Sequence, residues 1–188
     1  MLVQALRSLE AEENRLKRRH PAYVNVEHPI NFNPGVVVAG DWPSSVPEVC
    51  TVEVRLSCFP GEKLEEVETR VRAHLRQAIE SDPWLRSTRP EIAFFGFRAE
   101  GAVYDSHAEI GSTLASCHEA ITGRPLLPRP ITATTDNRFF QLYYGIPSVC
   151  YGPTGGQLHA PDEWVDLESV RICTRVLAST LADWCGVA

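Results

Sequence analysis

The most regular hydrophobic pattern in the chain lies in residues 50–58, CTVEVRLSC. Positions of one parity are Val, Leu or Cys, and positions of the other parity are Thr, Glu, Arg and Ser. A period of two is typical of a β-strand that has one buried and one polar face. The pattern therefore predicts a strand here and places Arg55 on its polar face.

Residues 2–19 and 62–80 instead have the 3.6-residue periodicity of amphipathic helices. The first helix should end at His20-Pro21, because proline disfavours helical backbone in the residue before it. The second carries Glu and Arg four residues apart, a spacing that favours ion pairs on a helix surface. The expected pairs are Glu66 with Arg70 and Glu68 with Arg72.

Two β-prone runs, 35–39 and 91–97, complete the order helix, strand, strand, helix, strand in residues 1–100. This order predicts an α+β domain with helices on one face of a mainly antiparallel sheet.

The pattern changes after residue 100. Helical periodicity covers 107–122 and 166–184, and a short helix is expected from Asp136. Short apolar runs at 131–133 and 146–151 lie on either side of that short helix. Strands alternating with helices predict an α/β arrangement for this part of the chain.

Charge and cysteine content narrow the class of protein. The net charge of −6 does not favour nucleic acid or an anionic membrane as a partner. The longest apolar runs fall short of the roughly 20 residues that a membrane-spanning helix needs. No two of the six cysteines form a close pair of the zinc-ribbon or redox type, and most have apolar neighbours, which is typical of reduced, buried thiols. We therefore expect a cytoplasmic protein.

His159 is the histidine with the most suggestive surroundings. It follows a glycine-rich loop in YGPTGGQLHAPDEWV, residues 151–165, a position where α/β sheets often place ligand groups. Imidazole is a common metal ligand, and Asp162 or Glu163 could orient its ring. A hydrolytic zinc site needs at least three protein ligands, and neither His-Glu-x-x-His nor His-x-Asp occurs in the sequence. From the residues alone, a metal ligand, a catalytic base and an ordinary surface residue all remain open.

The segment TATTDNRFFQLYYGIPSVCYGPTGGQLHAPDEWVDLESV resembles the C-terminal part of the acetylornithine deacetylase, succinyl-diaminopimelate desuccinylase and aminoacylase family of dinuclear zinc hydrolases. The matching motifs are T-D-x-R-F, G-I-P, Y-G-P and a histidine followed by P-x-E-x-V. Upstream, HPINFNPGVVVAGDWPSSVPEVCTVEVRLSCFPGE resembles the lid, or dimerisation, domain of that family. The resemblance covers nearly the whole chain, although composition and periodicity give no sign of it.

The resemblance assigns roles to individual residues. His159 falls on the family's last metal ligand, and Arg138 on the arginine that holds the substrate carboxylate. Arg55 falls on the arginine that ends the second lid strand, which implies contact with substrate across a dimer. Asp136 and Glu163 also match family positions, and we interpret them either as structural or as residues that support the residues of the site.

The fold implied by the resemblance is a lid-type α+β domain over residues 1–100, without its first strand. The C-terminal α/β portion of a zinc-hydrolase catalytic domain would follow over 101–188. The family's other ligands, its Glu-Glu pair and the histidine of its lid have no counterpart here. We therefore expect an N-terminally truncated form that is inactive alone and holds no catalytic residue of its own.

The complete enzyme implied by the resemblance hydrolyses the amide bond of an N-acyl amino acid. Its cofactors would be two zinc ions, with cobalt as an alternative metal. Its substrate would be a small N-acylated amino acid or dipeptide, and it would form a homodimer through the lid domain.

Two other functions remain open at this point. The chain could be a non-enzymatic dimerisation or assembly module derived from the lid, which the missing ligands favour. The presence of both His159 and Arg138 argues against that reading. A general α/β ligand-binding domain is the third possibility.

Overall fold

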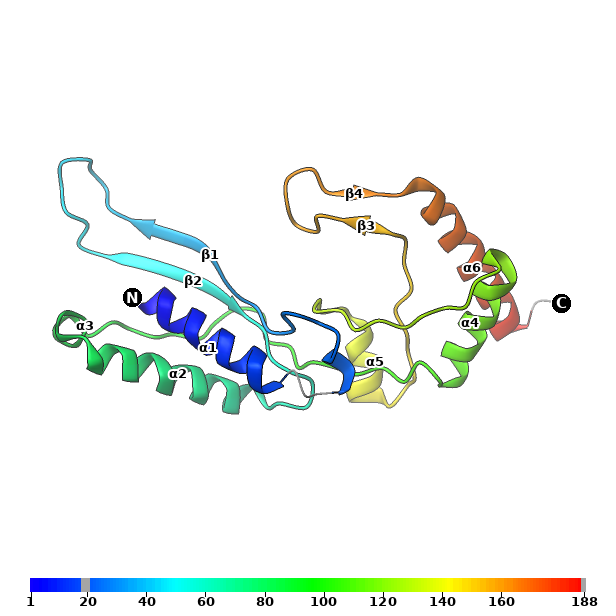
Figure 1. The fold of residues 1–188 in the computed structure, drawn as a ribbon, viewed down its shortest axis with the longest axis horizontal. Coiled ribbons are helices and arrows are strands. Elements are labelled where there is room, and N and C mark those ends of the chain that lie inside the picture. The colour runs from blue at the N-terminus through cyan, green and yellow to red at the C-terminus, as the bar shows by residue number, and fades with distance from the viewer. Residues whose placement is uncertain (18–20, 187–188) are drawn as a thin grey trace. The chain divides into compact units, whose positions relative to one another are not determined.

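The computed structural model describes residues 1–17 and 21–186, and its architecture is a mixed α/β fold with small antiparallel sheets (Figure 1). The chain forms two compact units. The N-terminal unit comprises Met1–Gly101 together with Pro130–Thr134. The C-terminal unit comprises Ala102–Arg129 and Thr135–Ala188. Within the described residues, no helix is long and apolar enough to cross a membrane.

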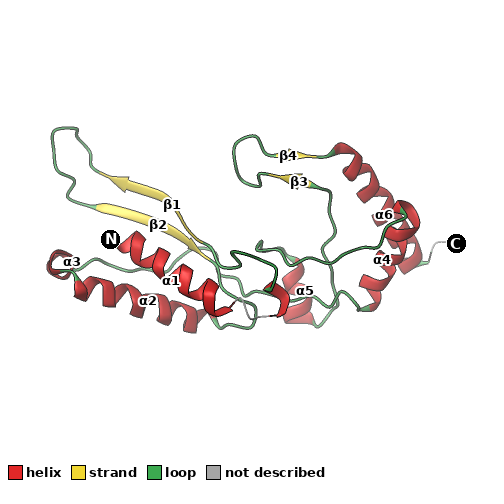
Figure 2. Cartoon of the chain, in the orientation of Figure 1, coloured by secondary structure: helices red, strands yellow, loops and turns green. Residues whose placement is uncertain are grey.

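The N-terminal unit contains one two-stranded sheet and several helices (Figure 2). Its strands are antiparallel, with Phe32 opposite Leu56 and Ala39 opposite Cys50, and the register shifts between Pro34 and Val36. The strand predicted at 50–58 and the helices predicted at 2–19 and 62–80 are confirmed, except that residues 18 and 19 lie outside the described part. The elements are α1 (Leu2–Lys17), the 3₁₀ helix η1 (Pro21–Tyr23), β1 (Phe32–Ala39), β2 (Cys50–Leu56), α2 (Leu64–Ser81) and α3 (Pro83–Thr88).

The core of this unit lies among α1, α2 and the strands. Asn14 is a buried polar residue of α1, and its side chain both donates to the carbonyl and accepts from the N–H of Ile30, each at 2.9 Å. This pairing satisfies both backbone groups of a residue that is only 2% exposed, so it fixes the chain before β1 against the helix. The buried apolar members of the core are Leu6, Leu9, Tyr23, Ile30, Phe32, Phe59, Val67, Val71 and Leu75.

The prediction of a third strand at 91–97 is wrong. Ile92 and Phe94 pack against the core, as the alternating pattern suggests, but residues 91–96 form no backbone hydrogen bond with any described segment. A strand is defined by its hydrogen-bonded neighbour, and the described sheet has only two strands.

The expected ion pairs along α2 are also wrong, because partners from other elements take the arginines. Arg70 contacts Glu13 at 3.0 Å and Glu62 at 2.9 Å. Arg72 donates to the carbonyl of Ile92 at 2.7 Å.

The C-terminal unit is built on the packing of α4 against α6, with Val176 fully buried between Leu114 and Cys117. The helices predicted at 107–122, from Asp136 and at 166–184 are confirmed. Neither apolar run, 131–133 in the N-terminal unit or 146–151 in this one, forms a strand. Among the described residues of this unit, the sheet is a single short hairpin. The elements are α4 (Glu109–Thr122), α5 (Asn137–Tyr144), β3 (Gly155–Gly156), β4 (Trp164–Val165) and α6 (Leu167–Cys185).

Candidate functional site

His159 lies in the loop of the β3–β4 hairpin, where Gly155 pairs with Val165 and Gly156 with Trp164. The ring of Trp164 lies directly on the backbone of Gly156, because a Cβ atom there would be 2.8 Å from the indole Nε1. A Cβ atom on Gly155 would be 2.7 Å from the Trp164 carbonyl oxygen. Both glycines are therefore required for the two strands to approach this closely, which explains the glycine pair before the histidine.

The loop between these strands has an unusual backbone. Gln157, His159 and Asp162 have φ angles of 56°, 61° and 62°, in the left-handed region that residues with a Cβ atom rarely adopt. The N–H of Ala160 donates to the Gln157 carbonyl at 2.9 Å, and the N–H of His159 donates to Oε2 of Glu163 at 3.3 Å. These bonds hold the tight turn and leave the side chain of His159 exposed.

The expectation that Asp162 or Glu163 orients the imidazole is not met. Glu163 contacts the backbone N–H of His159 instead of its ring. Neither ring nitrogen of His159 forms a hydrogen bond or an ion pair with a described residue. Both nitrogens are therefore accessible to a ligand from solution or from another protein segment.

The base of the hairpin is tied to the start of α6. The N–H of Asp166 donates to the Thr154 carbonyl at 2.9 Å, and the N–H of Thr154 donates to Oγ of Ser169 at 2.9 Å. The carboxylate of Asp166 also caps α6, accepting from the N–H groups of Glu168 and Ser169 at 2.7 and 3.1 Å. The hairpin is thus anchored to a long helix through both of its strands.

Sequence reasoning missed this anchor and the contact between Trp164 and Gly156. The signal for the first was present, since an Asp directly before a periodic apolar segment is the usual N-cap of a helix. The second contact had no signal in the residue pattern, because it depends on the pairing of two-residue strands.

A complete metal site is not formed by the described residues. No group of three His, Cys, Asp or Glu side chains among them could hold a metal ion. A zinc site requires at least three protein ligands, so His159 by itself does not fit the metal that the family resemblance implies. At most, it is one donor of a larger set.

Arg138 lies on α5 and is only 5% exposed. Its guanidinium carbon is 4.1 Å from the ring centroid of Phe139, within cation–π distance. The helix is held in place by its neighbour Asn137, whose side-chain amide donates to the Val149 carbonyl at 2.6 Å and to the Cys150 sulfur at 3.0 Å. A rigid, buried guanidinium on this helix has the chemistry to bind a carboxylate.

Asp136 occupies the N-cap position of α5, but its side chain forms no capping hydrogen bond. Arg55 lies on β2 in the N-terminal unit, exposed, with its guanidinium carbon 5.3 Å from the ring centroid of Phe97. The three predicted residues lie on three separate parts of the chain: Arg55 on β2, Arg138 on α5 and His159 in the β3–β4 loop.

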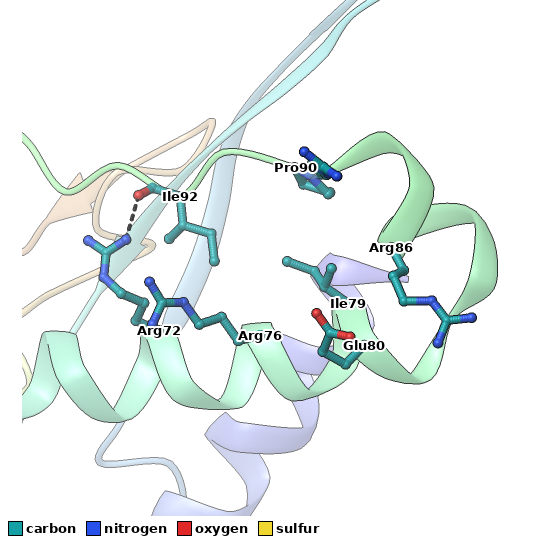
Figure 3. A pocket seen from close by; sticks show the side chains of 8 residues that line it. Arg72, Arg76, Ile79, Glu80, Arg86, Pro90 and Ile92 are labelled. Carbon is teal, nitrogen blue, oxygen red and sulfur yellow. Dashed lines mark hydrogen bonds between the residues drawn. The ribbon is translucent and has the colours of Figure 1, made fainter.

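The N-terminal unit has a hollow of about 450 Å³ between α2, α3 and the segment that follows (Figure 3). Arginines dominate its lining, but Arg86 projects away from the hollow, and Arg72 is used by the Ile92 carbonyl and the Phe94 ring. The hollow lies at the C-terminal ends of two helices, where cationic side chains complement the helix dipole. We interpret these arginines as structural.

Two half-buried groups that are not part of the hairpin loop have raised pKa values. Burial and then the charge of Glu62 raise the pKa of the Cys58 thiol above its ordinary value. Burial, with a smaller effect from Cys173, raises the pKa of Tyr151, whose hydroxyl is 2.8 Å from Nδ1 of His118. Both groups therefore stay protonated at neutral pH and serve the packing of the core.

Known proteins resemble this chain at low identity. It is 24% identical over 165 residues to an N-formyl-4-amino-5-aminomethyl-2-methylpyrimidine deformylase of Halalkalibacterium halodurans. It is 23% identical over 167 residues to a protein of the same name from Bacillus subtilis. Each match covers 82% of this chain and 38% of the relative, so the chain spans well under half the length of these proteins. The sequence profile of Peptidase family M20/M25/M40 matches residues 5–183, and the chain therefore belongs to that family.

Proposed function

We propose that this chain supplies part of a metal-dependent amidohydrolase that cleaves the amide bond of a small N-acyl amino acid. The observation that carries the proposal is the exposed imidazole of His159 on an anchored hairpin, within a chain that matches the family over residues 5–183. Since no three described residues form a metal site, the proposal requires further ligands from outside them.

His159 binds one metal ion through a ring nitrogen in this proposal. Zinc is the expected metal, with cobalt as an alternative, and when bound it polarises the amide carbonyl and activates a water molecule. The backbone of the hairpin loop and the tie between Thr154, Asp166 and Ser169 fix where the imidazole lies. In this proposal the chain therefore contributes to metal binding by holding the imidazole in a fixed place.

Arg138 is proposed to bind the carboxylate of the substrate. A guanidinium forms two parallel hydrogen bonds with a carboxylate, and its burial strengthens such bonds. Arg55 would contact substrate from a lid domain formed by residues 1–100, across a homodimer, whereas residues 101–188 would belong to the catalytic domain.

A deformylase acting on a formylated aminopyrimidine is the second candidate, because both relatives described above carry that name. The named compound contains a formamide and no carboxylate. If this chain acts on such a compound, Arg138 has no carboxylate to bind, so the two candidates differ in the role of that arginine.

A fusion protein tests the proposal. The part of the Bacillus subtilis relative that lies outside the aligned 167 residues would be joined to this chain and assayed with zinc or cobalt. The substrates would be N-acetyl and N-formyl amino acids and N-formyl-4-amino-5-aminomethyl-2-methylpyrimidine. His159→Ala should remove nearly all activity and lower bound metal, whereas His107→Ala, at an exposed histidine of the same unit, should change neither.

The outcomes separate the candidates. Preference for amino-acid amides supports the first, and preference for the pyrimidine supports the second. Full activity and metal content in the His159→Ala variant would contradict the assignment of the ligand. An inactive fusion protein that still binds metal through His159 would favour the non-enzymatic assembly role.

A further inference from the structure

The arginine-lined hollow of the N-terminal unit contains more positive charge than its structural contacts use. Its volume is about 450 Å³, and it lies between α2, α3 and the segment that follows α3 (Figure 3). Arg86 projects away from it, and the other charged residues of its lining are Arg72, Arg76, Arg89 and Glu80. Three arginines and one glutamate leave two positive charges in the hollow, although the net charge of the chain is −6.

Arg72 and Arg76 lie four residues apart on α2, so their side chains are on the same face of the helix. In Figure 3 the side chain of Arg76 extends toward that of Arg72. The Arg72 guanidinium is held by a 2.7 Å hydrogen bond to the Ile92 carbonyl and lies 5.0 Å from the ring centroid of Phe94. Like charges at this spacing repel each other, and an anion bound by both groups removes that repulsion.

The charge of Arg76 has no acidic partner among the described residues. Glu80 lies four residues further along α2, a spacing that allows an ion pair. The described ion pairs of α2 are instead made by Arg70, Glu65 and Glu68, and none of them includes Arg76 or Glu80. Arg76 therefore lines the hollow with a guanidinium that no described carboxylate binds.

Arg89 lines the hollow from an unusual backbone conformation. It is the C-cap of α3, with a φ angle of 49° in the left-handed region, and its N–H donates to the Leu85 carbonyl at 3.0 Å. The same position of α4 and α5 is occupied by Gly123 and Gly145, which adopt this conformation without strain. Arginine strains the backbone there, and strained residues cluster at sites that bind ligands. The end of α3 thus does not by itself require an arginine.

The last carbonyls of α2 and α3 are bound by other groups. The hydroxyl of Ser81 donates to the Ala78 carbonyl at 2.8 Å, and the hydroxyl of Thr88 donates to the Leu85 carbonyl at 3.2 Å. The helix dipole favours a cation near such an end, and Arg86 in the last turn of α3 supplies one. The helix ends therefore account for Arg86 and leave the arginines that face the hollow unexplained.

The remaining residues of the lining are apolar. They are Ile79, Pro90 and Ile92, which we term the apolar wall. A concave surface that combines apolar side chains with a few convergent charged groups is typical of sites for small molecules, whose volumes run from about 300 to 1,000 Å³. The hollow lies within this range of volumes.

We propose that the hollow is a binding site for a small phosphorylated compound. The guanidinium groups of Arg72, Arg76 and Arg89 bind the phosphate, and the organic part of the compound lies against the apolar wall. A phosphate monoester carries about 1.5 to 2 negative charges at pH 7, which match the two positive charges of the hollow. A carboxylate carries one charge and matches them less well. This inference is independent of the proposed hydrolytic activity, which uses other residues.

Calorimetric titration of the 188-residue chain tests the site. The probes are phenyl phosphate, inorganic phosphate and benzoate, compared at constant ionic strength because salt screens such charges. Phenyl phosphate should bind one molecule per chain with a Kd below about 1 mM. Inorganic phosphate lacks the group that contacts the apolar wall and should bind about 3-fold more weakly. Benzoate has a single charge and should bind about 10-fold more weakly.

Four variants locate the groups that bind the phosphate. Arg76→Gln and Arg89→Gln should each weaken the binding of phenyl phosphate about 10-fold, because each removes a charge-assisted hydrogen bond. Arg86→Gln is the matched control, since it removes the same charge from a side chain that projects away, and it should change the Kd less than about 2-fold. Glu80→Gln removes the one carboxylate of the lining and should tighten binding.

A glycine variant separates binding from folding. Arg89→Gly removes the guanidinium and relieves the left-handed strain at the C-cap of α3. The variant should lose about 10-fold in affinity for phenyl phosphate without a fall in the urea midpoint of unfolding. A lower midpoint would mean that Arg89 serves the fold and would remove the argument from strain.

Three further results would overturn the proposal. Absence of binding at about 10 mM phenyl phosphate would show that the hollow is not a phosphate site. Equal weakening by Arg76→Gln and Arg86→Gln would assign the binding to the general charge of this surface. Benzoate that binds as tightly as phenyl phosphate would show that the hollow does not recognise phosphate.

Discussion

Replacement of Asp166 by alanine tests whether the hairpin that carries His159 is held by the start of α6. The carboxylate of Asp166 accepts from the N–H groups of Glu168 and Ser169, and its own N–H donates to Thr154 in the hairpin. Alanine keeps the backbone bond and loses both side-chain bonds. Because α6 and the hairpin share this residue, unwinding of the first helical turn should also release the base of β3.

The size of the effect follows from the two lost bonds. Loss of an Asp N-cap costs about 0.5–2 kcal/mol, and both bonds here are charge-assisted, so we expect about 1–2 kcal/mol. That cost raises the population of the locally open state about 5–30-fold. Glu168→Ala is the matched control, since it removes a carboxylate from the same helical turn but no capping bond, and should cost less than about 1 kcal/mol.

Hydrogen exchange followed by mass spectrometry provides the assay. Peptides from residues 152–176 should exchange faster in Asp166→Ala by the factor given above, and peptides from α2 should be unchanged. Exchange in residues 152–166 at the rate of the unaltered chain would refute the anchoring role. Equal acceleration by Glu168→Ala would assign the effect to helix-dipole charge instead of the cap.

Three further changes have definite expected outcomes. Asn14→Ala should destabilise the N-terminal unit by about 2–4 kcal/mol in urea unfolding, because it strands the buried N–H and C=O of Ile30, whereas Gln4→Ala should change little. The folded state holds the Cys58 proton more tightly than the unfolded chain, so the contribution of this thiol to stability should be fully present at neutral pH and be lost as the pH rises above 9.0, and Cys58→Ala should reduce that loss. In the fusion protein, Arg138→Ala should lower kcat/KM for N-acyl amino acids, with a loss of about 2–3 kcal/mol of transition-state stabilisation and no change in metal content. An equal loss with a substrate that lacks a carboxylate would contradict the carboxylate-binding role.

The helices were predictable because the residue pattern that specifies each helix lies within one short segment of the chain. The period of 3.6 residues located α1, α2, α4 and α6 to within a few residues. Two of the helices end at a glycine, since Gly123 and Gly145 adopt the left-handed conformation that terminates α4 and α5.

The sheet was not predictable in the same way. Residues 50–58 and 91–97 both alternate or are rich in β-forming side chains, yet only the first forms a strand among the described residues. Alternation reports which side chains are buried, and it does not report whether a hydrogen-bonding partner is present. The ion pairs predicted along α2 were wrong for a related reason, because Arg70 and Arg72 instead bind partners that are distant in sequence.

The candidate site was likewise predictable only where the information is local in the sequence. His159 was singled out from the glycine-rich loop around it, and the ligand role proposed for it rests only on the family resemblance. The structure supplies the physical cause of that loop, namely the approach of Trp164 to Gly156 and the bonds from Asp166 to α6. No local pattern indicated further donors, and no group of three His, Cys, Asp or Glu side chains among the described residues could hold a metal ion.

Helix α6 has an apolar surface that is exposed to solvent. Cys173, Val176 and Thr180 are buried on the side that packs against α4, while Leu177, Leu181 and Trp184, spaced four and three residues apart, form a second apolar face. Leu181 is 63% exposed and Trp184 47% exposed. A helix that is apolar on two sides is normally covered on both. The second face of α6 is therefore a surface that a further protein segment would cover. The proposed metal site has the same requirement, because a zinc site needs at least three protein donors and the described residues bring no such group together.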